Sequence, residues 1–504
     1  MKRGLLLPLA LTIGCAAKPD PVVPPAPDPP APPPSFVAPV GEVAKVTPDA
    51  DFRKEAPPAG APIAFVPPKI EEAKLKNGVR VLLVTRNDLP LVAVRIVAVG
   101  GGGDAPPGIA GFANALLLSG TKTRSAVEIS DALGGMGAQF GVFADDDGSG
   151  MFLNVLSDKL GDALAIAGES LAGPTFPADE LERERKRRLT SLAQVRDSAG
   201  RQLWAETLKV LYPSGHPYAL PMLGTEAAVT RAKAAELAAF HARTFTPDHV
   251  TVSVVGDVKR EALLPLLERT LGALKGHGGK ARAPVAPPPA SDKAAKIVIV
   301  DRKGATQTNL QVALPGVPRS TPDFDALLVM NTIFGSGFSS RLNMNLREKH
   351  AYTYGARSGF DFRRGPGPFI AGGAIVREAT AKATKEIFSE VDRIRQELVT
   401  DDELAFAKSS IIDKLPSLFE TNGDTASALA SLSLYGLPLD EYEKRAARIK
   451  AITKEEVLRV AKKYLDPKAM RVVMVGDHEK ISAEVTALGL GKVELAAEPP
   501  KPKP

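Results

Sequence analysis

The chain has 504 residues, 44% of them hydrophobic, and its 64 Lys and Arg against 58 Asp and Glu leave a formal charge of only +6. This length accommodates two to four domains, each with its own core. The densest basic run, residues 182–188, begins with alternating acids and lacks interleaved aromatic residues, so it predicts a solvated helix face. The composition therefore favours a globular protein and argues against nucleic-acid binding.

The first 15 residues resemble a bacterial lipoprotein signal. Two basic residues precede an apolar run at residues 4–13, and a glycine precedes Cys15, the single cysteine. Such a signal is cleaved before the cysteine, whose thiol is then acylated, and the run is too short to span a membrane. Thr12 stands where the motif usually has Leu, which leaves an ordinary secretory signal as the alternative. Because Ala16 rather than Asp follows, we expect lipidation at Cys15 and an outer-membrane anchor facing the periplasm, with the lipid as the only membrane attachment.

Composition then divides the rest of the chain. Residues 16–68 are rich in Pro and Ala and predict an extended stalk of polyproline II type. The folded body is expected in two domains, at residues 69–275 and 294–490. A Gly- and Pro-rich linker at residues 276–293 separates them, and residues 491–504 are expected to form a disordered tail.

The first domain opens with strand patterns. Residues 72–84 predict a β-hairpin with Asn77-Gly78 as a type I′ turn. Leu91–Val99 predicts a further strand, and residues 100–108 form a glycine-rich loop.

A helix and a second hairpin are predicted next. Ser125 and Glu128 have the spacing of a capping box at a helix start. Residues 139–143 and 150–155 predict a pair of strands around three acids, Asp145–Asp147. Three acids at a turn are able to bind a hard cation, but no EF-hand spacing follows. We therefore expect a solvated turn.

The two domains look like repeats of one unit. Each closes with an apolar strand that ends in Gly-Asp, and in both the glycine lies nine positions after a proline: Pro247 and Gly256 in the first, Pro467 and Gly476 in the second. Duplicated units with strands before helices favour the α+β class.

Residues 108–121 read GIAGFANALLLSGT. This frame resembles the metal-binding segment of the M16 (insulinase/pitrilysin, mitochondrial-processing-peptidase-like) zinc peptidases, roughly G-x-A-H-x-x-E-H-x-x-x-x-G-T. The positions of His, Glu and His hold Gly111, Asn114 and Ala115. The family's third ligand, a Glu about 76 residues later, falls on Ser191. Zinc takes imidazole, thiolate or carboxylate ligands, so we expect a degenerate metal site and no cofactor in this chain.

The resemblance covers the whole folded body. It implies a LuxS/MPP-like metallohydrolase fold of the α+β class, with two homologous halves of antiparallel-rich sheets flanked by helices, enclosing a chamber. No other residues suggest a rebuilt zinc site, because the histidines form neither H-x-x-x-H nor H-E-x-x-H. They are His216, His241, His249, His277, His350 and His478.

The resemblance also implies one surviving functional pair. M16 peptidases use an Arg and a Tyr seven residues apart in the second half to hold the substrate backbone and stabilise the oxyanion. Arg347 and Tyr354 have that spacing, and Tyr352 replaces Tyr354 if the register shifts by two. Without the family frame, Arg347 would be an ion-pair partner of Glu348 or a neighbouring residue on a helix surface, and Tyr354 an aromatic residue of a strand.

These features lead to one main hypothesis and two alternatives. The main one is a non-zinc subunit of a periplasmic heterodimeric M16 peptidase, which holds an extended peptide and offers Arg347 and Tyr354 in trans to a zinc-bearing partner chain. The first alternative is a non-catalytic scaffold or peptide-binding lipoprotein of the cell envelope. The second, a stand-alone zinc metalloendopeptidase, requires a metal site that the sequence does not offer.

Overall fold

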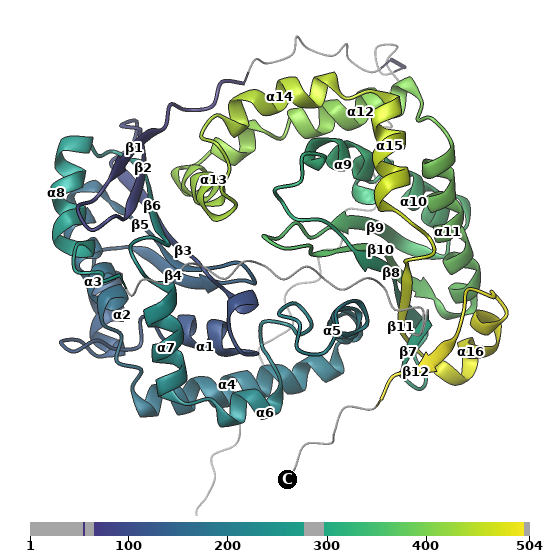
Figure 1. Ribbon diagram of the computed structural model, residues 1–504, viewed down its shortest axis with the longest axis horizontal. Helices are drawn as coiled ribbons and strands as arrows, with labels where there is room; N and C mark the ends of the chain where they lie inside the picture. Colours follow the sequence, from purple (N-terminus) through teal and green to yellow (C-terminus); the bar gives the residue numbers. More distant parts are fainter. Residues whose placement is uncertain (1–53, 56–64, 277–296, 498–504) are drawn as a thin grey trace, which may run out of the picture. The chain divides into compact units, whose positions relative to one another are not determined.

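The computed structural model describes residues 54–55, 65–276 and 297–497, and the two longer ranges belong to one compact unit (Figure 1). The predicted signal, almost all of the stalk and the linker lie outside the described residues. The folded part begins slightly earlier than expected, because Phe65 packs against the ring of Phe419 with centroids 5.4 Å apart. Among the described residues, no helix is both long and apolar enough to cross a bilayer.

The first half is built on a six-stranded sheet of order β1-β2-β6-β3-β5-β4. Its strands are β1 (Glu71–Lys74), β2 (Arg80–Thr85), β3 (Leu91–Val99), β4 (Gln139–Ala144), β5 (Gly148–Leu156) and β6 (Val250–Gly256). β2 and β6 run parallel, and the other neighbours are antiparallel. β3 therefore has the predicted bounds, and the predicted pair around the acids is confirmed.

The β1–β2 hairpin is confirmed, but its predicted type I′ turn is wrong. That turn needs a positive φ at both central residues, whereas only Gly78 has one, of 105°. The amide of Gly78 donates to the carbonyl oxygen of Leu75, so the chain turns one residue earlier and Gly78 takes the left-handed position after that turn.

Helices cover one face of this sheet and enclose the first core (Figure 1). The helices of the first half are α1 (Ile109–Ala115), α2 (Ala126–Gly135), α3 (Leu160–Ala172), α4 (Ala178–Asp197), α5 (Ala199–Leu211), α6 (Glu226–Arg231), α7 (Ala234–Thr244) and α8 (Arg260–Leu271). The capping box predicted for α2 is present, with Ser125 and Glu128 bonded to each other's backbone amides. α3 and α8 bury leucines against the alternate apolar residues of β3 and β5.

The second half repeats the plan. Its sheet has the order β12-β7-β11-β8-β10-β9. The strands are β7 (Ile297–Asp301), β8 (Gln307–Pro315), β9 (Thr353–Phe360), β10 (Pro368–Val376), β11 (Arg471–Gly476) and β12 (Val493–Leu495). β12 pairs parallel with β7. The expectation of a disordered tail from residue 491 is therefore wrong, because three residues of that segment form a strand of the sheet.

The second core lies between this sheet and its helices. The helices of the second half are α9 (Phe324–Asn331), α10 (Arg341–Asn343), α11 (Thr380–Gln396), α12 (Asp401–Ile412), α13 (Asn422–Leu434), α14 (Glu441–Ala451), α15 (Lys454–Tyr464) and α16 (His478–Thr486), and all of them except α13 contribute residues to this core. Two π-helical turns, η4 (Thr332–Ser336) and η5 (Met344–Lys349), flank α10.

The halves exchange a helix. α5 of the first half packs on β8 and β11, and α13 of the second half packs on β3 and β6. A hydrogen bond of 2.8 Å between Thr207 Oγ1 and Gln311 Oε1 joins α5 to β8. Each exchanged helix covers the sheet of the other half, on the face opposite to that sheet's own core. We call this face of each sheet the inner face.

Candidate functional site

The degenerate segment forms α1, a helix of seven residues. Gly108 begins it in a left-handed conformation, with φ of 82°, which glycine adopts without the Cβ clash of other residues. Ile109, Ala110, Phe112 and Ala113 are buried, and α1 packs on α7 and β4. The segment thus forms a helix that is held by apolar packing.

Asn114 stands at the position of the family's catalytic base, and its side chain forms hydrogen bonds with the backbone. Its side chain is 2% exposed. Its Nδ2 donates to the carbonyl oxygens of Phe143, at 2.5 Å, and Gly150, at 3.1 Å. The amide therefore ties α1 to β4 and β5, and an amide cannot accept a proton as a carboxylate base does.

At Gly111 the neighbouring group is a cation. A β-carbon added there would lie 3.3 Å from Nη2 and 3.4 Å from Nη1 of Arg188, which comes from α4. Arg188 is 6% exposed, and its Nε donates to Glu184 Oε1 at 2.7 Å. The guanidinium also lies 5.0 Å from the centroid of the Phe112 ring. Burial lowers the pKa of Arg188, and the attraction of Glu184 opposes that shift.

The remaining two positions offer no ligand. Ala115 has only a methyl group, and Ser191 Oγ donates to the Arg187 carbonyl oxygen of its own helix at 3.0 Å. Across the described residues, no three His, Cys, Asp or Glu side chains are grouped as a metal site requires. The residues at these four positions thus do not fit a zinc ion, which takes three protein ligands in catalytic sites, and a guanidinium lies beside one of them.

A cavity of about 750 Å³ opens beside α1. Its wall combines the glycine-rich loop, Gly111, and the segment after α5 with Tyr212, His216 and Met222. The Tyr212 and His216 rings stack with centroids 4.7 Å apart. No sequence pattern indicated this cavity, because its wall comes from segments about 100 residues apart.

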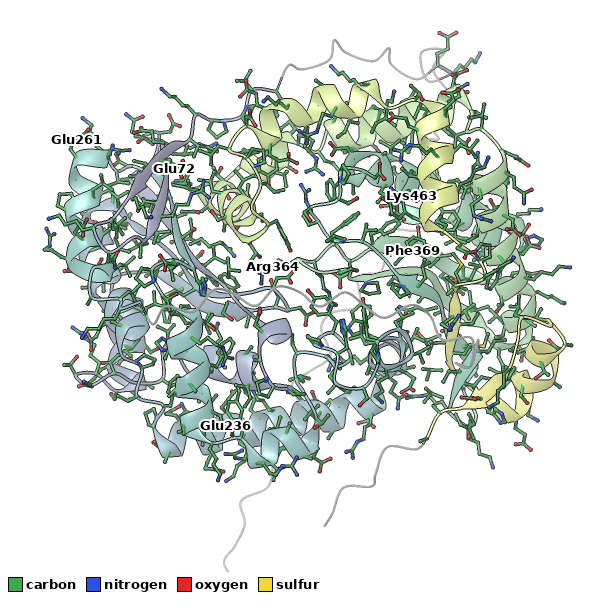
Figure 2. The ribbon with its side chains drawn as sticks, in the orientation of Figure 1. Glu72, Glu236, Glu261, Arg364, Phe369 and Lys463 are labelled. Atoms are coloured by element: carbon green, nitrogen blue, oxygen red, sulfur yellow. The ribbon has the colours of Figure 1, made fainter. Side chains whose placement is uncertain are left out.

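The acidic turn after β4 is an interface, so the expectation of a solvated turn is wrong. Asp146 Oδ2 pairs with Arg363 Nη1 at 2.7 Å, and Asp147 Oδ2 accepts from the backbone amide of Arg364 at 2.8 Å. Both arginines belong to the loop at residues 361–367, which joins β9 to β10 and carries Arg364 toward the first half (Figure 2). Asp147 is 3% exposed, and burial raises the pKa of both Asp146 and Asp147 to about 6.

Tyr218 completes this contact. Its hydroxyl donates to Asp147 Oδ1 at 3.0 Å and accepts from the Gly365 amide at 3.0 Å. The Arg363 guanidinium lies over its ring, 4.7 Å from the centroid. Two sequence-distant loops, one acidic and one basic, thus join the halves; the complementary charges were visible in the sequence, but their pairing was not.

Arg347 lies on η5, at the surface of the second half. Its side chain is 40% exposed, with Nε 3.2 Å from Glu348 Oε1. The guanidinium also lies 4.7 Å from the centroid of the Phe338 ring, a residue that is itself 64% exposed. The contact with Glu348 is a surface ion pair of the kind expected without the family frame. Together the two contacts leave part of the guanidinium open to solvent.

Tyr354 is the second residue of β9, an edge strand, and is 88% exposed. The register of β9 against β10 shifts between Gly373 and Ile375, so a β-bulge falls at this residue. Bulges re-aim side chains and interrupt regular pairing. Tyr352, the alternative, is half-buried and stacks on His350 with centroids 4.9 Å apart. η5 and β9 pack together, which brings the two segments of the pair together, although Arg347 and Tyr354 do not line the cavity beside α1.

Comparisons with known families match both halves. The family described as "Insulinase (Peptidase family M16)" matches residues 92–226, and "Peptidase M16 inactive domain" matches residues 231–411. Together these matches cover more than half of the chain.

Relatives and solved structures agree with those matches. An uncharacterized zinc protease of Mycobacterium tuberculosis is 27% identical over 361 residues, 71% of this chain and 81% of the relative. An uncharacterized zinc protease of Streptomyces coelicolor is 24% identical over 79% of this chain and 87% of the relative. The crystal structure of a peptidase M16 inactive domain from Pseudomonas fluorescens matches with a TM-score of 0.75 and 29% identity, over 81% of this chain and 98% of that one. A protease from Helicobacter pylori, 21% identical with a TM-score of 0.74 over 81% of this chain and 99% of that one, has the same fold.

Proposed function

Because the chain belongs to the M16 peptidase family, we propose that it is the non-zinc subunit of an M16-type peptidase. It holds an extended peptide and supplies Arg347 and Tyr354 to the zinc site of a partner chain. One observation carries the proposal: the four positions of the family's metal site hold no ligand, and the buried Arg188 guanidinium lies against one of them.

A buried cation next to the metal position works against zinc. Two unit charges 4 Å apart repel by about 4 kcal/mol at an effective dielectric constant of 20, and Zn²⁺ carries two. Glu184 Oε1 already accepts a hydrogen bond from Arg188 Nε at 2.7 Å, which leaves no carboxylate of that pair free for a metal. In this chain α1 and α4 are stabilised by the ion pair and by the Asn114 amide, and zinc chemistry belongs to the partner.

Arg347 and Tyr354 supply the part of the reaction assigned to this chain. The partner's zinc would activate the water that attacks the peptide carbonyl. The Arg347 guanidinium would then hold the substrate backbone, and the Tyr354 hydroxyl would donate to the developing oxyanion. The high exposure of Tyr354 at a β-bulge suits a side chain that acts on a group outside its own half.

The substrate is proposed to bind as an added strand. β4 and β9 are both edge strands, and a free edge offers a row of main-chain donors and acceptors to an extended peptide. We further propose that the chain acts at the periplasmic side of the outer membrane, anchored by a lipid on Cys15, since the N-terminal sequence resembles a lipoprotein signal.

The test is to express the chain alone and together with a zinc-bearing M16 chain encoded beside it, and to measure zinc content and peptide cleavage. We expect no stoichiometric zinc in the lone chain and cleavage only by the complex. Tyr354→Phe should lower kcat of the complex about a hundredfold, as loss of one oxyanion donor does, and Arg347→Ala should lower kcat/KM because the substrate backbone is held less well. Arg393→Ala, an exposed arginine of α11, should leave cleavage unchanged.

Other outcomes would favour the other functions. Stoichiometric zinc with cleavage by the lone chain would mean a stand-alone zinc endopeptidase. Cleavage by the complex that is indifferent to Arg347→Ala and Tyr354→Phe would mean a non-catalytic scaffold. The contact between Arg347 and Glu348 at 3.2 Å is the observation in favour of that scaffold.

A further inference from the structure

Arg95 places a cation on the inner face of the first sheet. It lies in the middle of β3, opposite Phe152 on β5. Side chains alternate along a strand, and Val94 and Ile96 point into the first core. Ala93, two residues before Arg95, packs with the α13 cluster on the other face. Arg95 therefore faces away from the core and toward the inner face.

Two aromatic rings flank its guanidinium. The Arg95 guanidinium carbon lies 5.2 Å from the centroid of Phe143 and 5.8 Å from that of Phe152. A β-carbon at Gly141 would lie 2.7 Å from the Phe152 ring, and one at Gly150 would lie 2.8 Å from the Phe143 ring. The two glycines thus leave room for the rings to lie over β4 and β5. We call Arg95, Phe143 and Phe152 the aromatic–cation platform.

Arg95 differs from the buried Arg188 and Arg363 because no carboxylate neutralises it. Arg188 pairs with Glu184, and Arg363 pairs with Asp146. Among the described residues no ion pair to Arg95 is formed, and burial alone lowers its pKa, with no charged neighbour contributing. A half-buried guanidinium without an anion has lost solvation that a protein partner does not replace. A ligand carboxylate would replace it, and would gain two parallel hydrogen bonds.

The platform also lies next to the proposed peptide-binding edge. Phe143 is on β4, the edge strand, and Asn114 of the degenerate segment donates to its carbonyl oxygen. Neighbouring strands lie about 4.8 Å apart, so an extended peptide paired with β4 would direct every second side chain to the face that carries the rings. A glutamate, whose side chain is longer than that of aspartate, would reach farthest toward the guanidinium.

We infer that the aromatic–cation platform selects peptides that present a carboxylate, foremost a glutamate side chain, to Arg95. This inference rests on the proposed peptide-holding role and adds a substrate class to it: acidic peptides rather than neutral or basic ones. The rings contribute by excluding water from the ion pair and by holding the guanidinium in place.

The test uses the full chain and fluorescein-labelled octapeptides of Ser, Ala and Val with one Glu, Gln or Lys at position four or five. Binding is measured by fluorescence anisotropy, with amidated and with free C-termini. The amidated Glu peptide should bind about tenfold tighter than the Gln peptide, at one of the two positions, because side chains alternate. The Lys peptide should bind most weakly. A similar increase in affinity from a free C-terminus would show that the terminal carboxylate is a second source of the carboxylate that Arg95 binds.

Variants test whether Arg95 is responsible. Arg95→Met, which retains apolar packing, should bind the Glu and Gln peptides equally. Arg269→Met, at an exposed arginine of α8, should keep the preference. If Arg95→Met does not fold, Arg95→Lys should lower the preference without abolishing it, because lysine keeps the charge but not the paired donors.

The outcomes separate this inference from the proposed function. Equal binding of Glu and Gln peptides by the natural chain, with either terminus, would overturn the inference and leave the peptide-holding role intact. A preference for the Glu peptide that survives in folded Arg95→Met would also overturn the inference. So would a failure of that variant to bind the Gln peptide. If the natural chain bound no peptide at all, both the peptide-holding role and the inference would be wrong.

Discussion

In the first half a parallel pair, β2 and β6, lies beside the antiparallel strands β3, β5 and β4, and in the second half β7, β11, β8, β10 and β9 repeat that order. The halves differ in the segment that follows one matching strand along the chain, which is β3 in the first half and β8 in the second. The strand β3 leads to the short α1, stabilised by Asn114 and Arg188, whereas β8 leads to α9 and two π-helical turns, one of which presents Arg347. The shared sheet therefore accounts for the fold, and the segments between strands decide the chemistry.

We expect the largest effect from restoring the family's ligands at the four metal positions of the first half. A variant with Gly111→His, Asn114→Glu, Ala115→His and Ser191→Glu regains the family's ligands but retains the Arg188 guanidinium beside position 111. We expect zinc affinity at least about a hundredfold weaker than in the same variant with Arg188→Met added, because the cation repels the metal. Equilibrium dialysis with zinc measures both. Equal affinities would show that Arg188 moves aside and does not oppose the metal.

The buried ion pair itself gives the next effect. Arg188→Met leaves Glu184 8% exposed, with only the mostly solvent-exposed Arg187 as its partner. We expect the free energy of unfolding to fall by about 3 kcal/mol, as for other broken buried pairs. Urea denaturation measures it.

The double variant Arg188→Met with Glu184→Leu should recover most of that loss. Arg183→Met, an exposed residue of the same helix with a side chain 72% exposed, should change stability by less than about 0.5 kcal/mol. A loss in the double variant as large as in Arg188→Met would mean that packing of the arginine stem, rather than the stranded charge, is responsible.

The acidic turn shows where prediction from sequence stops. The strands β3, β4 and β5, the capping box of α2 and the repeat of two units could be read from the chain, because alternation and capping are local signals. The burial of Asp147 at 3% exposure could not, since it depends on Arg364, which lies 217 positions away. The same holds for Arg188: its helix was evident from the sequence, but its place beside Gly111 depends on how α1 and α4 pack.

The contact between the halves should weaken as pH rises. Burial raises the folded-state pKa of Asp146 to about 6, above its ordinary value of 3.8. The folded state therefore holds more protons between those values, and the stability from this group is present below about pH 4 and lost as pH rises through about 6. Asp146→Asn should make the loss of unfolding free energy between pH 4 and pH 7 about 2 kcal/mol smaller than in the natural chain.

Urea denaturation across that pH range tests this expectation, with Asp158→Asn, an exposed site, as the control. The difference between natural chain and variant matters, because other carboxylates act in the opposite direction: Arg341 holds the pKa of Glu403 down to about 2. Identical pH profiles for the natural chain and Asp146→Asn would show that Arg363 keeps Asp146 ionised throughout.

The smallest expected effect concerns Arg347 and Tyr354, the pair that we propose acts on a partner chain. Tyr354 is 88% exposed and the Arg347 side chain is 40% exposed, so Tyr354→Phe and Arg347→Met should each change the unfolding free energy of the lone chain by less than about 0.5 kcal/mol. Urea denaturation measures this. A loss above about 1 kcal/mol would mean that the pair stabilises the second half and that its spacing is a consequence of folding. Unchanged stability, with reduced cleavage by the complex, would separate the two halves by role: α4 of the first keeps buried charges only for stability, and η5 and β9 of the second present exposed side chains to a substrate.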